Sequence, residues 1–379
     1  MTSTKRLLWF QRALAKGFHV AAPLEQSPVW EEIKKAGRVT GGGERLAVLL
    51  PTIAQRLDPQ TLRRISENVG AEVAILSEGG TEVAVYIVVQ YMSDTMHHLA
   101  EQRRSELAAM LFSNTGQGDT TVSVHSATMR GPGKVLSLNA MLLRASEFAP
   151  GAAVLLDDDV EMESACLAAL LACYREMDLP AAVGATKVGH SAEGRASKFL
   201  YWAKSHTAPA TQYPHACCML VTMSVIQNGF PTELSSDDGF ICFELLDPHA
   251  DDPLHRLKLE PRARVHHVIG GDGNAMYQRI RRMLLNHYQF LCAYEWTKGR
   301  FYCRDLLFFG FWPVGKSVSK GTFRSRAIRW WVKAAYFTWF TSIGVELAVR
   351  AITRRPIRAI PWGSGTTVVA STPATQEIA

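Results

Sequence analysis

Short apolar runs that alternate with helically spaced segments constrain the fold of this chain more than any other feature of its sequence. The run at residues 46–50 is closed by Pro51-Thr52, the run at 83–89 is rich in β-branched residues, and the run at 152–156 stops at three aspartates. Strands that alternate with helices form a mostly parallel sheet with helices on both faces, so we expect an α/β fold. The predicted strands are 46–50, 73–76, 83–89, 121–124, 152–156, 182–188 and 264–269, and the predicted helices are 57–69, 94–111, 134–146, 164–177, 239–246, 276–293 and 327–352.

The length of 379 residues allows one large α/β domain and an appendage. We expect a basic amphipathic segment at 1–43, a catalytic domain at 44–300, a basic aromatic helical region at 301–362 and a disordered tail at 363–379. The seven cysteines are odd in number and irregularly spaced. This pattern predicts reduced thiols and a cytoplasmic protein rather than a disulfide framework.

Asp157-Asp158-Asp159 directly follows the predicted strand at 152–156. Ligands of parallel α/β sheets bind beyond the carboxyl ends of the strands. Three carboxylates at such an end repel one another unless a cation lies among them, and hard oxygen ligands suit Mg²⁺ or Mn²⁺, which can hold a diphosphate. The alternative is an acidic loop that caps the following helix.

Three further groups of residues could take part in chemistry. Asp237-Asp238 precedes an apolar helix, so the pair is either a helix cap or the source of a general base for a hydroxyl. The cluster Gln278, Arg279, Arg281 and Arg282 is either a solvated helix start or a set of donors to phosphate oxygens. His266-His267 ends a predicted strand and is either structural or the source of a third metal ligand.

Six segments, taken in order, resemble the motifs of glycosyltransferase family 2, whose catalytic domain has the GT-A fold. Their order and spacing carry the resemblance, which covers residues 46–286. The segment between Gly80 and Lys134 is longer than the family pattern and contains an extra strand-like run. The six are Leu49-Leu50-Pro51-Thr52, Ile75-Leu76-Ser77-Glu78-Gly79-Gly80, Gly133-Lys134 with Leu138-Asn139-Ala140, Leu156-Asp157-Asp158-Asp159, Gly229-Phe230 with Asp237-Asp238, and Gln278-Arg279-Ile280-Arg281-Arg282.

The resemblance implies an inverting transfer of a sugar from a nucleotide sugar, with UDP-sugars as the expected donors, to a hydroxyl of a glycan or lipid-linked acceptor. Asp157 and Asp159 would hold Mg²⁺ or Mn²⁺ on the donor diphosphate, and Asp238 would deprotonate the acceptor hydroxyl. The donor-binding residues that the resemblance implies are Glu78, Lys134, Asp157, Gln278 and Arg281.

The net charge of +6 is concentrated near the carboxyl terminus. Residues 300–358 contain twelve Lys and Arg side chains, opposed by Asp305 and Glu346. A basic segment rich in Trp and Phe favours an anionic membrane surface over nucleic acid. Twelve uncharged residues at 334–345 are too few to cross a bilayer. We therefore expect an interfacial helix at 327–352 and a peripheral position at the inner face of the cell membrane; the alternative is an aromatic helix packed on the catalytic domain.

Two other classes of protein fit part of the pattern. A haloacid dehalogenase-type phosphatase would use Asp157-x-Asp159-Val160 as its nucleophile motif and Asp237-Asp238 as its late acidic pair. However, that nucleophile follows the first strand of its domain, whereas here several predicted elements come earlier. A catalytically inactive, membrane-associated scaffold or sugar-binding module is the second alternative.

Overall fold

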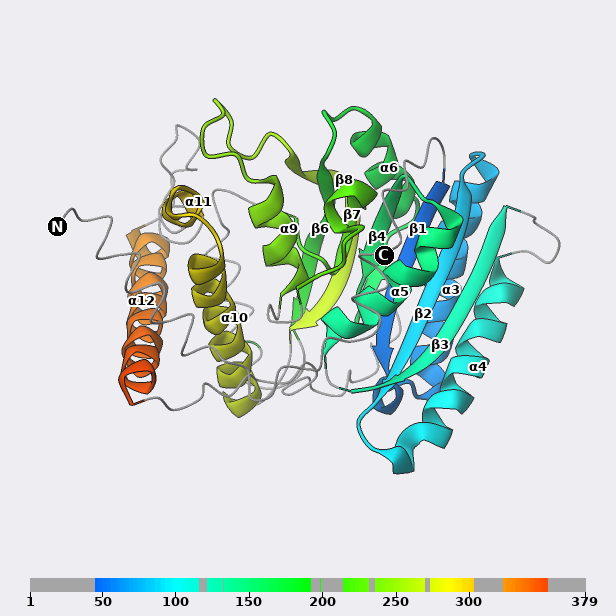
Figure 1. Cartoon of the computed structure of the whole chain (residues 1–379), viewed down its shortest axis with the longest axis horizontal. Helices are drawn as coiled ribbons and strands as arrows, with labels where there is room; N and C mark the ends of the chain where they lie inside the picture. The colour runs from blue at the N-terminus through cyan, green and yellow to red at the C-terminus, as the bar shows by residue number, and fades with distance from the viewer. Residues whose placement is uncertain are drawn as a thin grey trace.

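The computed structural model describes residues 45–115, 121–131, 133–191, 198, 214–231, 236–269, 273–302 and 323–353. Within them, eight strands form one sheet with helices on both faces (Figure 1). The strands are β1 (Arg45–Ile53), β2 (Glu82–Tyr91), β3 (Val122–Arg130), β4 (Ala152–Leu156), β5 (Val160–Met162), β6 (Ala182–Ser191), β7 (Cys218–Thr222) and β8 (Leu257–Ile269). The helices are α3 (Pro59–Glu78), α4 (His97–Asn114), α5 (Lys134–Phe148), α6 (Cys166–Arg175), α8 (Met223–Ile226), α9 (Asp237–Leu245), α10 (Gly273–Ala293), α11 (Trp296–Phe301) and α12 (Phe323–Ile352). The segments predicted at 1–43 and 363–379 lie outside the described residues.

The strand order is β3-β2-β1-β4-β7-β6-β8-β5. Strands β1 to β4 pair in parallel, β7 runs antiparallel to both of its neighbours, and β6 pairs in parallel with β8. The predicted α/β class with a GT-A type of sheet is therefore confirmed. Because β6 and β8 run in the same direction as β4, the carboxyl ends of six strands lie at one edge, where ligands of such sheets bind. We call this the carboxyl edge.

The prediction of a strand at 73–76 is wrong, because helix α3 continues to Glu78. It begins after Asp58, whose side chain accepts a hydrogen bond from the Thr61 N–H (2.8 Å). The second parallel strand of the sheet is instead β2, which contains the β-branched run at 83–89. This run is the one that exceeds the family pattern between Gly80 and Lys134. The short apolar run belongs to one helical stripe of buried side chains, which includes Leu62, Ile65, Val69, Val73 and Leu76.

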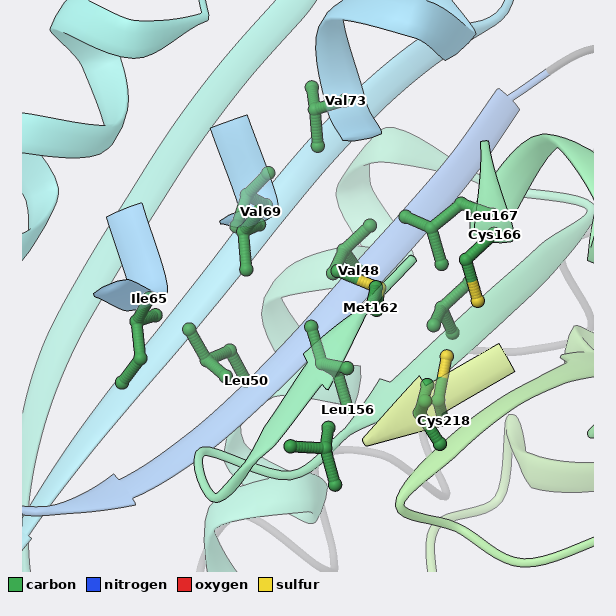
Figure 2. Packing of buried hydrophobic residues seen from close by; sticks show 14 of the residues in the cluster. Val48, Leu50, Ile65, Val69, Val73, Leu156, Met162, Cys166, Leu167 and Cys218 are labelled. Atoms are coloured by element: carbon green, nitrogen blue, oxygen red, sulfur yellow. The ribbon is translucent and has the colours of Figure 1, made fainter. Parts of the chain in front are cut away.

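Both faces of the central strands are buried, as a parallel sheet between two helical layers requires. Along β1, Val48 and Leu50 point to the layer of α3, α4 and α6, while Leu49 points to the layer that includes α5, α9 and α10. Figure 2 shows Val48 and Leu50 beside Ile65 and Val69 of α3. Packing on both faces holds β1 and β4 in place along the sheet. It thereby sets the positions of the polar residues that follow these two strands.

Helices α10 and α12 lie side by side beyond the sheet (Figure 1). Ile343 and Leu347 of α12 are buried against Leu284 and Leu285 of α10. The predicted helix at 327–352 is thus confirmed as α12. Among the described residues, no helix is both long enough and apolar enough to cross a bilayer.

Candidate functional site

The aspartates at 157–159, which we call the first acidic motif, divide into one buried residue and two that reach the carboxyl edge. The Asp158 carboxylate is buried and accepts hydrogen bonds from Thr52 Oγ1 (2.6 Å) and Arg56 Nη1 (3.0 Å). Asp157 is 28% exposed at its side chain, and Asp159 is exposed. Strand β5 follows the motif, so the motif does not cap a helix. The first acidic motif therefore presents the carboxylates of Asp157 and Asp159 at the carboxyl edge, while that of Asp158 is buried.

Two side chains of helix α3 form hydrogen bonds with main-chain groups of the segment that follows β4. Arg64 donates to the carbonyls of Asp158 (2.6 Å) and Val160 (3.0 Å). One turn later, Asn68 donates to the Met162 carbonyl (2.8 Å) and accepts from the Met162 N–H (2.9 Å). Residues four apart share a helix face. These four bonds therefore fix the backbone on which the first acidic motif lies.

Lys134, the first residue of α5, joins this motif to the second acidic motif, Asp237-Asp238. Its buried Nζ lies 2.5 Å from Asp157 Oδ1 and 2.7 Å from Asp237 Oδ2, and it donates to the Ala216 carbonyl (3.3 Å). Burial alone would lower the pKa of Lys134, but the charges of the two carboxylates raise it above its ordinary value. Lys134 is therefore a permanent cation that connects two aspartates, Asp157 and Asp237, which are 80 positions apart in the chain.

Asp238 lies in the first turn of α9 and is 28% exposed at its side chain. Its carboxylate accepts from the Gly239 N–H (2.8 Å), from Ser236 Oγ, and from His215 Nδ1 (3.3 Å). Burial opposes ionisation, but the hydrogen bonds from His215 and Ser236, with the charges of His215 and Lys187, hold the pKa of Asp238 well below its usual range. Ser236 caps the helix, so Asp238 is free of that role and is ionised at neutral pH.

Two close contacts place the second acidic motif. Asn139 of α5 donates to the Phe230 carbonyl (2.9 Å) and accepts from the Phe230 N–H (2.7 Å), which fixes Phe230 against α5. Gly239 lets the backbone of α9 approach Phe290 of α10, because an added Cβ would lie 2.1 Å from the Phe290 ring. The Leu-Asn-Ala and Gly-Phe segments of the sequence are thus bonded to each other across the fold.

Lys187 and His215 belong to the site but carried no signal in the sequence. Lys187 is exposed on β6, and its charge acts on Asp238 and on Cys217, whose pKa burial raises to about 11. His215 precedes β7, and the approach of this segment to β6 depends on Gly184, where an added Cβ would lie 2.8 Å from Pro214. Neither residue follows a strand within a recognisable motif, so only the fold brings them to the acidic residues.

The structure corrects the position predicted for Glu78. This residue is exposed at the end of α3, which runs from the carboxyl edge back to the amino-terminal edge of the sheet. It does not follow a strand at the edge where Asp157 lies. Asp94, which follows β2, lies at the carboxyl edge and is bonded to Arg130 Nη1 (3.1 Å). Asp94 is the third residue after β2, so a search for acidic residues shortly after a predicted strand would also have found it.

Gln278 and Arg281 lie on α10, and their predicted roles at the donor are not tested by the structure. Gln278 is half-buried. The Arg281 guanidinium forms a fork with Glu346 of α12, with both nitrogen–oxygen distances at 2.7 Å. The side chain of Arg279 lies outside the described residues. The arginine fork that we expected to bind phosphate thus also ties α10 to α12.

His266 and His267 of β8 point to opposite faces of the sheet, as neighbours in a strand must. His266 is bonded to Glu163 (2.8 Å) and to His190 (2.6 Å), and its ring stacks on that of His190. His267 pairs across the sheet with Val160, the residue after the first acidic motif. In the described part of the chain, no three His, Cys, Asp or Glu side chains are grouped so that they could hold a metal ion.

No protein-family model matches the chain, and no curated protein matches it. Among solved structures, the chain is similar to the mannosyltransferase PcManGT from Pyrobaculum calidifontis in complex with GDP-Man and Mn²⁺. The identity is 15%, 92% of this chain and 98% of that chain are covered, and the TM-score is 0.44.

The chain is also similar to glucosyl-3-phosphoglycerate synthase from Mycobacterium tuberculosis, at 15% identity over 68% of this chain and 84% of that chain, with a TM-score of 0.36. A structure of that synthase with Mg²⁺ and UDP matches at 12% identity over 68% of this chain and 83% of that chain, with a TM-score of 0.36. Similarity of this extent carries no activity over to the chain, and the chemistry rests on the side chains described above.

Proposed function

We propose that this chain is a metal-dependent glycosyltransferase that moves a hexosyl group from a nucleotide sugar to a hydroxyl of a glycan or lipid-linked acceptor, with inversion. One observation carries the proposal. Lys134 bonds to Asp157 of the first acidic motif (2.5 Å) and to Asp237 of the second (2.7 Å), which brings the candidate metal ligands and the candidate base to the same edge. Residues 44–300 are the proposed catalytic unit.

The donor diphosphate would bind at the first acidic motif through Mg²⁺ or Mn²⁺. Asp157 and Asp159 are the protein ligands, and their carboxylate oxygens suit either ion. A magnesium ion on a nucleotide commonly takes one or two carboxylates and completes its shell with phosphate and water. A pair of protein ligands therefore fits the ion. When bound, the ion would neutralise charge on the leaving diphosphate.

At the acceptor, Asp238 is the proposed base. Its carboxylate is ionised and partly exposed, so it can accept the proton of a hydroxyl that attacks the anomeric carbon from the side opposite the diphosphate. A single displacement of this kind inverts the anomeric centre. Lys187, Gln278 and Arg281 supply cationic or amide donors for the departing diphosphate.

For the nucleoside we replace Glu78 by Asp94, because Asp94 follows β2 at the carboxyl edge. A carboxylate there can accept hydrogen bonds from ribose hydroxyls or from a base N–H. Uridine is the proposed nucleoside of the donor.

The test is the release of nucleoside diphosphate from a panel of UDP- and GDP-sugars, with Mn²⁺, with Mg²⁺ and with a chelator. We expect turnover of one donor, dependent on metal and lost in Asp238→Asn. Phosphate release without a sugar donor, with an aspartyl-phosphate that hydroxylamine traps, would support the phosphatase instead. If none of the donors turns over and none binds, the inactive scaffold or binding module is supported.

A further inference from the structure

Helix α12 has an inner face that is fully engaged with α10. Ile343 and Leu347 are buried, and the ring of Phe340 stacks on that of Tyr288 with centroids 4.5 Å apart. The Tyr288 hydroxyl donates to the Phe340 carbonyl (2.7 Å). These contacts fix the rotation of α12 about its axis, and so decide which side chains face outward.

The charges in the second half of α12 also lie on the inner side. Glu346 accepts the fork of Arg281 from α10 and a hydrogen bond from Arg350 (2.8 Å), one turn further along α12. At about 100° per residue, the positions of Glu346 and Arg350 lie on the same half of the helix as Ile343 and Leu347. The ion pairs therefore close the inner face and leave the opposite side without charge.

The outer face is apolar and exposed. At about 100° per residue, six large side chains fall within a sector of about 120° that is opposite the buried one. No position of this sector between residues 327 and 352 is occupied by a charged residue, over a length of about 39 Å. The six are half of the large apolar side chains that are exposed among the described residues: Trp330, Trp331, Phe337, Val345, Val349 and Ile352.

The hydroxyl groups on this face are bonded within the helix. Thr338 donates to the Ala334 carbonyl (2.8 Å), Thr341 to the Phe337 carbonyl (2.9 Å), and Ser342 to the carbonyl of Trp339 (2.9 Å). A hydroxyl that is satisfied by its own backbone is tolerated in surroundings that offer no water. The outer face can therefore leave water without losing a hydrogen bond at these residues.

We propose that the outer face of α12 docks on the surface of an anionic lipid bilayer, with the helix in the plane of the interface. Trp residues favour this depth of the membrane, and an apolar sector of this width on a basic helix is typical of interfacial binding. The α12 sequence has five Lys and Arg residues against one Glu. At about 100° per residue these basic positions all lie outside the apolar sector. A second copy of the chain would therefore bring like charge beside this face, whereas anionic lipid brings the opposite charge. Anionic lipid is characteristic of the cytoplasmic leaflet.

The test is co-sedimentation of the full chain with vesicles of phosphatidylcholine alone or of phosphatidylcholine mixed with phosphatidylglycerol, which is an anionic lipid. We expect binding to the anionic vesicles that weakens as salt is added. Phe337→Ser should weaken this binding about tenfold, because the variant loses the favourable transfer of a Phe side chain from water into the membrane interface. Phe112→Ser on α4 is the matched control, since Phe112 is 55% and Phe337 is 56% exposed, and it should bind as the unsubstituted chain does.

Three results would overturn the proposal: no binding to anionic vesicles at low salt, equal binding of the two Phe variants, or a dimer in sedimentation velocity that Phe337→Ser dissolves while vesicles have no effect. Val345→Glu provides a second variant of the same face and should also weaken binding to the anionic vesicles. The readout does not depend on glycosyl transfer. Nucleoside diphosphate release with a soluble acceptor should be unchanged in Phe337→Ser, so failure of docking and failure of the proposed activity are distinguishable.

Discussion

The two acidic motifs at the carboxyl edge share a plan but differ in the cation that holds them. In each motif one aspartate is buried against a cation, Arg56 for Asp158 and Lys134 for Asp237. The other aspartates reach the edge. Arg56 is partly exposed, whereas Lys134 is buried and also bonds to Asp157.

This difference separates a local anchor from a shared one. Loss of the Asp158 anchor should disturb the first acidic motif alone. Loss of Lys134 should leave two carboxylates without their cation and disturb both motifs. Neighbouring aspartates in one motif therefore have different tasks, and substitutions can assign them.

The largest effect is expected for Asp238→Asn, which removes the proposed base and keeps the shape of the side chain. The rate of transfer should fall on the order of 10²–10⁴-fold, the usual contribution of a general base. Steady-state kinetics and donor binding measure the two consequences separately. Donor affinity should be retained, and a collapse of donor affinity in this variant would show that Asp238 is not the base.

Lys134→Met should lower the free energy of unfolding by about 3–5 kcal/mol, because removal of one partner leaves buried charge uncompensated. Chemical denaturation measures the change. Lys258→Met on β8 is the control, since that lysine is exposed and lies outside the two acidic motifs, and its cost should be within about 0.5 kcal/mol. A small loss in Lys134→Met would contradict the shared anchor.

Acid should weaken the second acidic motif through His287, a buried neighbour that accepts a hydrogen bond from Tyr302 (2.8 Å). Burial lowers the pKa of His287 to about 4, against the opposing charge of Asp238. The unfolded chain takes up this proton below its ordinary pKa of about 6.5 and the folded chain takes it up near 4. Stability is therefore full above pH 6.5 and falls by about 3 kcal/mol as the pH drops to about 4.

The free energy of unfolding, measured from pH 7 to pH 4, checks this dependence. His287→Gln, which keeps an acceptor for Tyr302, should flatten the profile relative to the unsubstituted chain. His98→Gln, at an exposed position on α4, should leave it unchanged. Identical profiles for the two variants would remove His287 from the account.

The smallest of these effects is expected for Asp158→Asn. Arg56 loses its charged partner but keeps access to water, so the cost should be about 1–3 kcal/mol. The transfer rate should change less than in Asp238→Asn, because Asp158 supports the first acidic motif without facing a ligand. Denaturation and kinetics on the same preparation test both parts. A rate loss as large as that of Asp238→Asn would mean that the buried aspartate takes part in the chemistry.

Much of the fold could be predicted because local signals agreed with the final structure. The spacing of apolar residues and the polar residues that end each run predict several elements and one motif. These are the strand at 152–156, the helix at 134–146 and the aspartates after β4. The first half of helix α3 was predicted as the helix at 57–69, but its second half was missed. Val73 to Leu76 is a run of four apolar residues with two glycines shortly after it, which fits a strand as well as a helix. The helix's length of 20 residues resolves the ambiguity.

The candidate site was predictable where a motif follows a strand and unpredictable where tertiary contacts assemble it. Asp157 and Asp238 belong to the first kind. His215 comes close to Asp238 because the residues before β7 lie beside the start of α9, and Arg281 binds Glu346 because α12 packs on α10. The spacing of residues along the chain predicts neither of these two contacts.

The most direct test of the central claim is the melting temperature of the chain with nucleoside diphosphates and nucleotide sugars, with and without Mn²⁺. A ligand of the folded state at a hundred times its dissociation constant stabilises the protein by about 2.7 kcal/mol. We predict a rise in melting temperature with one nucleotide that requires the metal, is lost in Asp159→Asn and is retained in Asp238→Asn. No rise with any nucleotide, or a rise that persists without metal and in Asp159→Asn, would contradict the assignment of the first acidic motif to the donor.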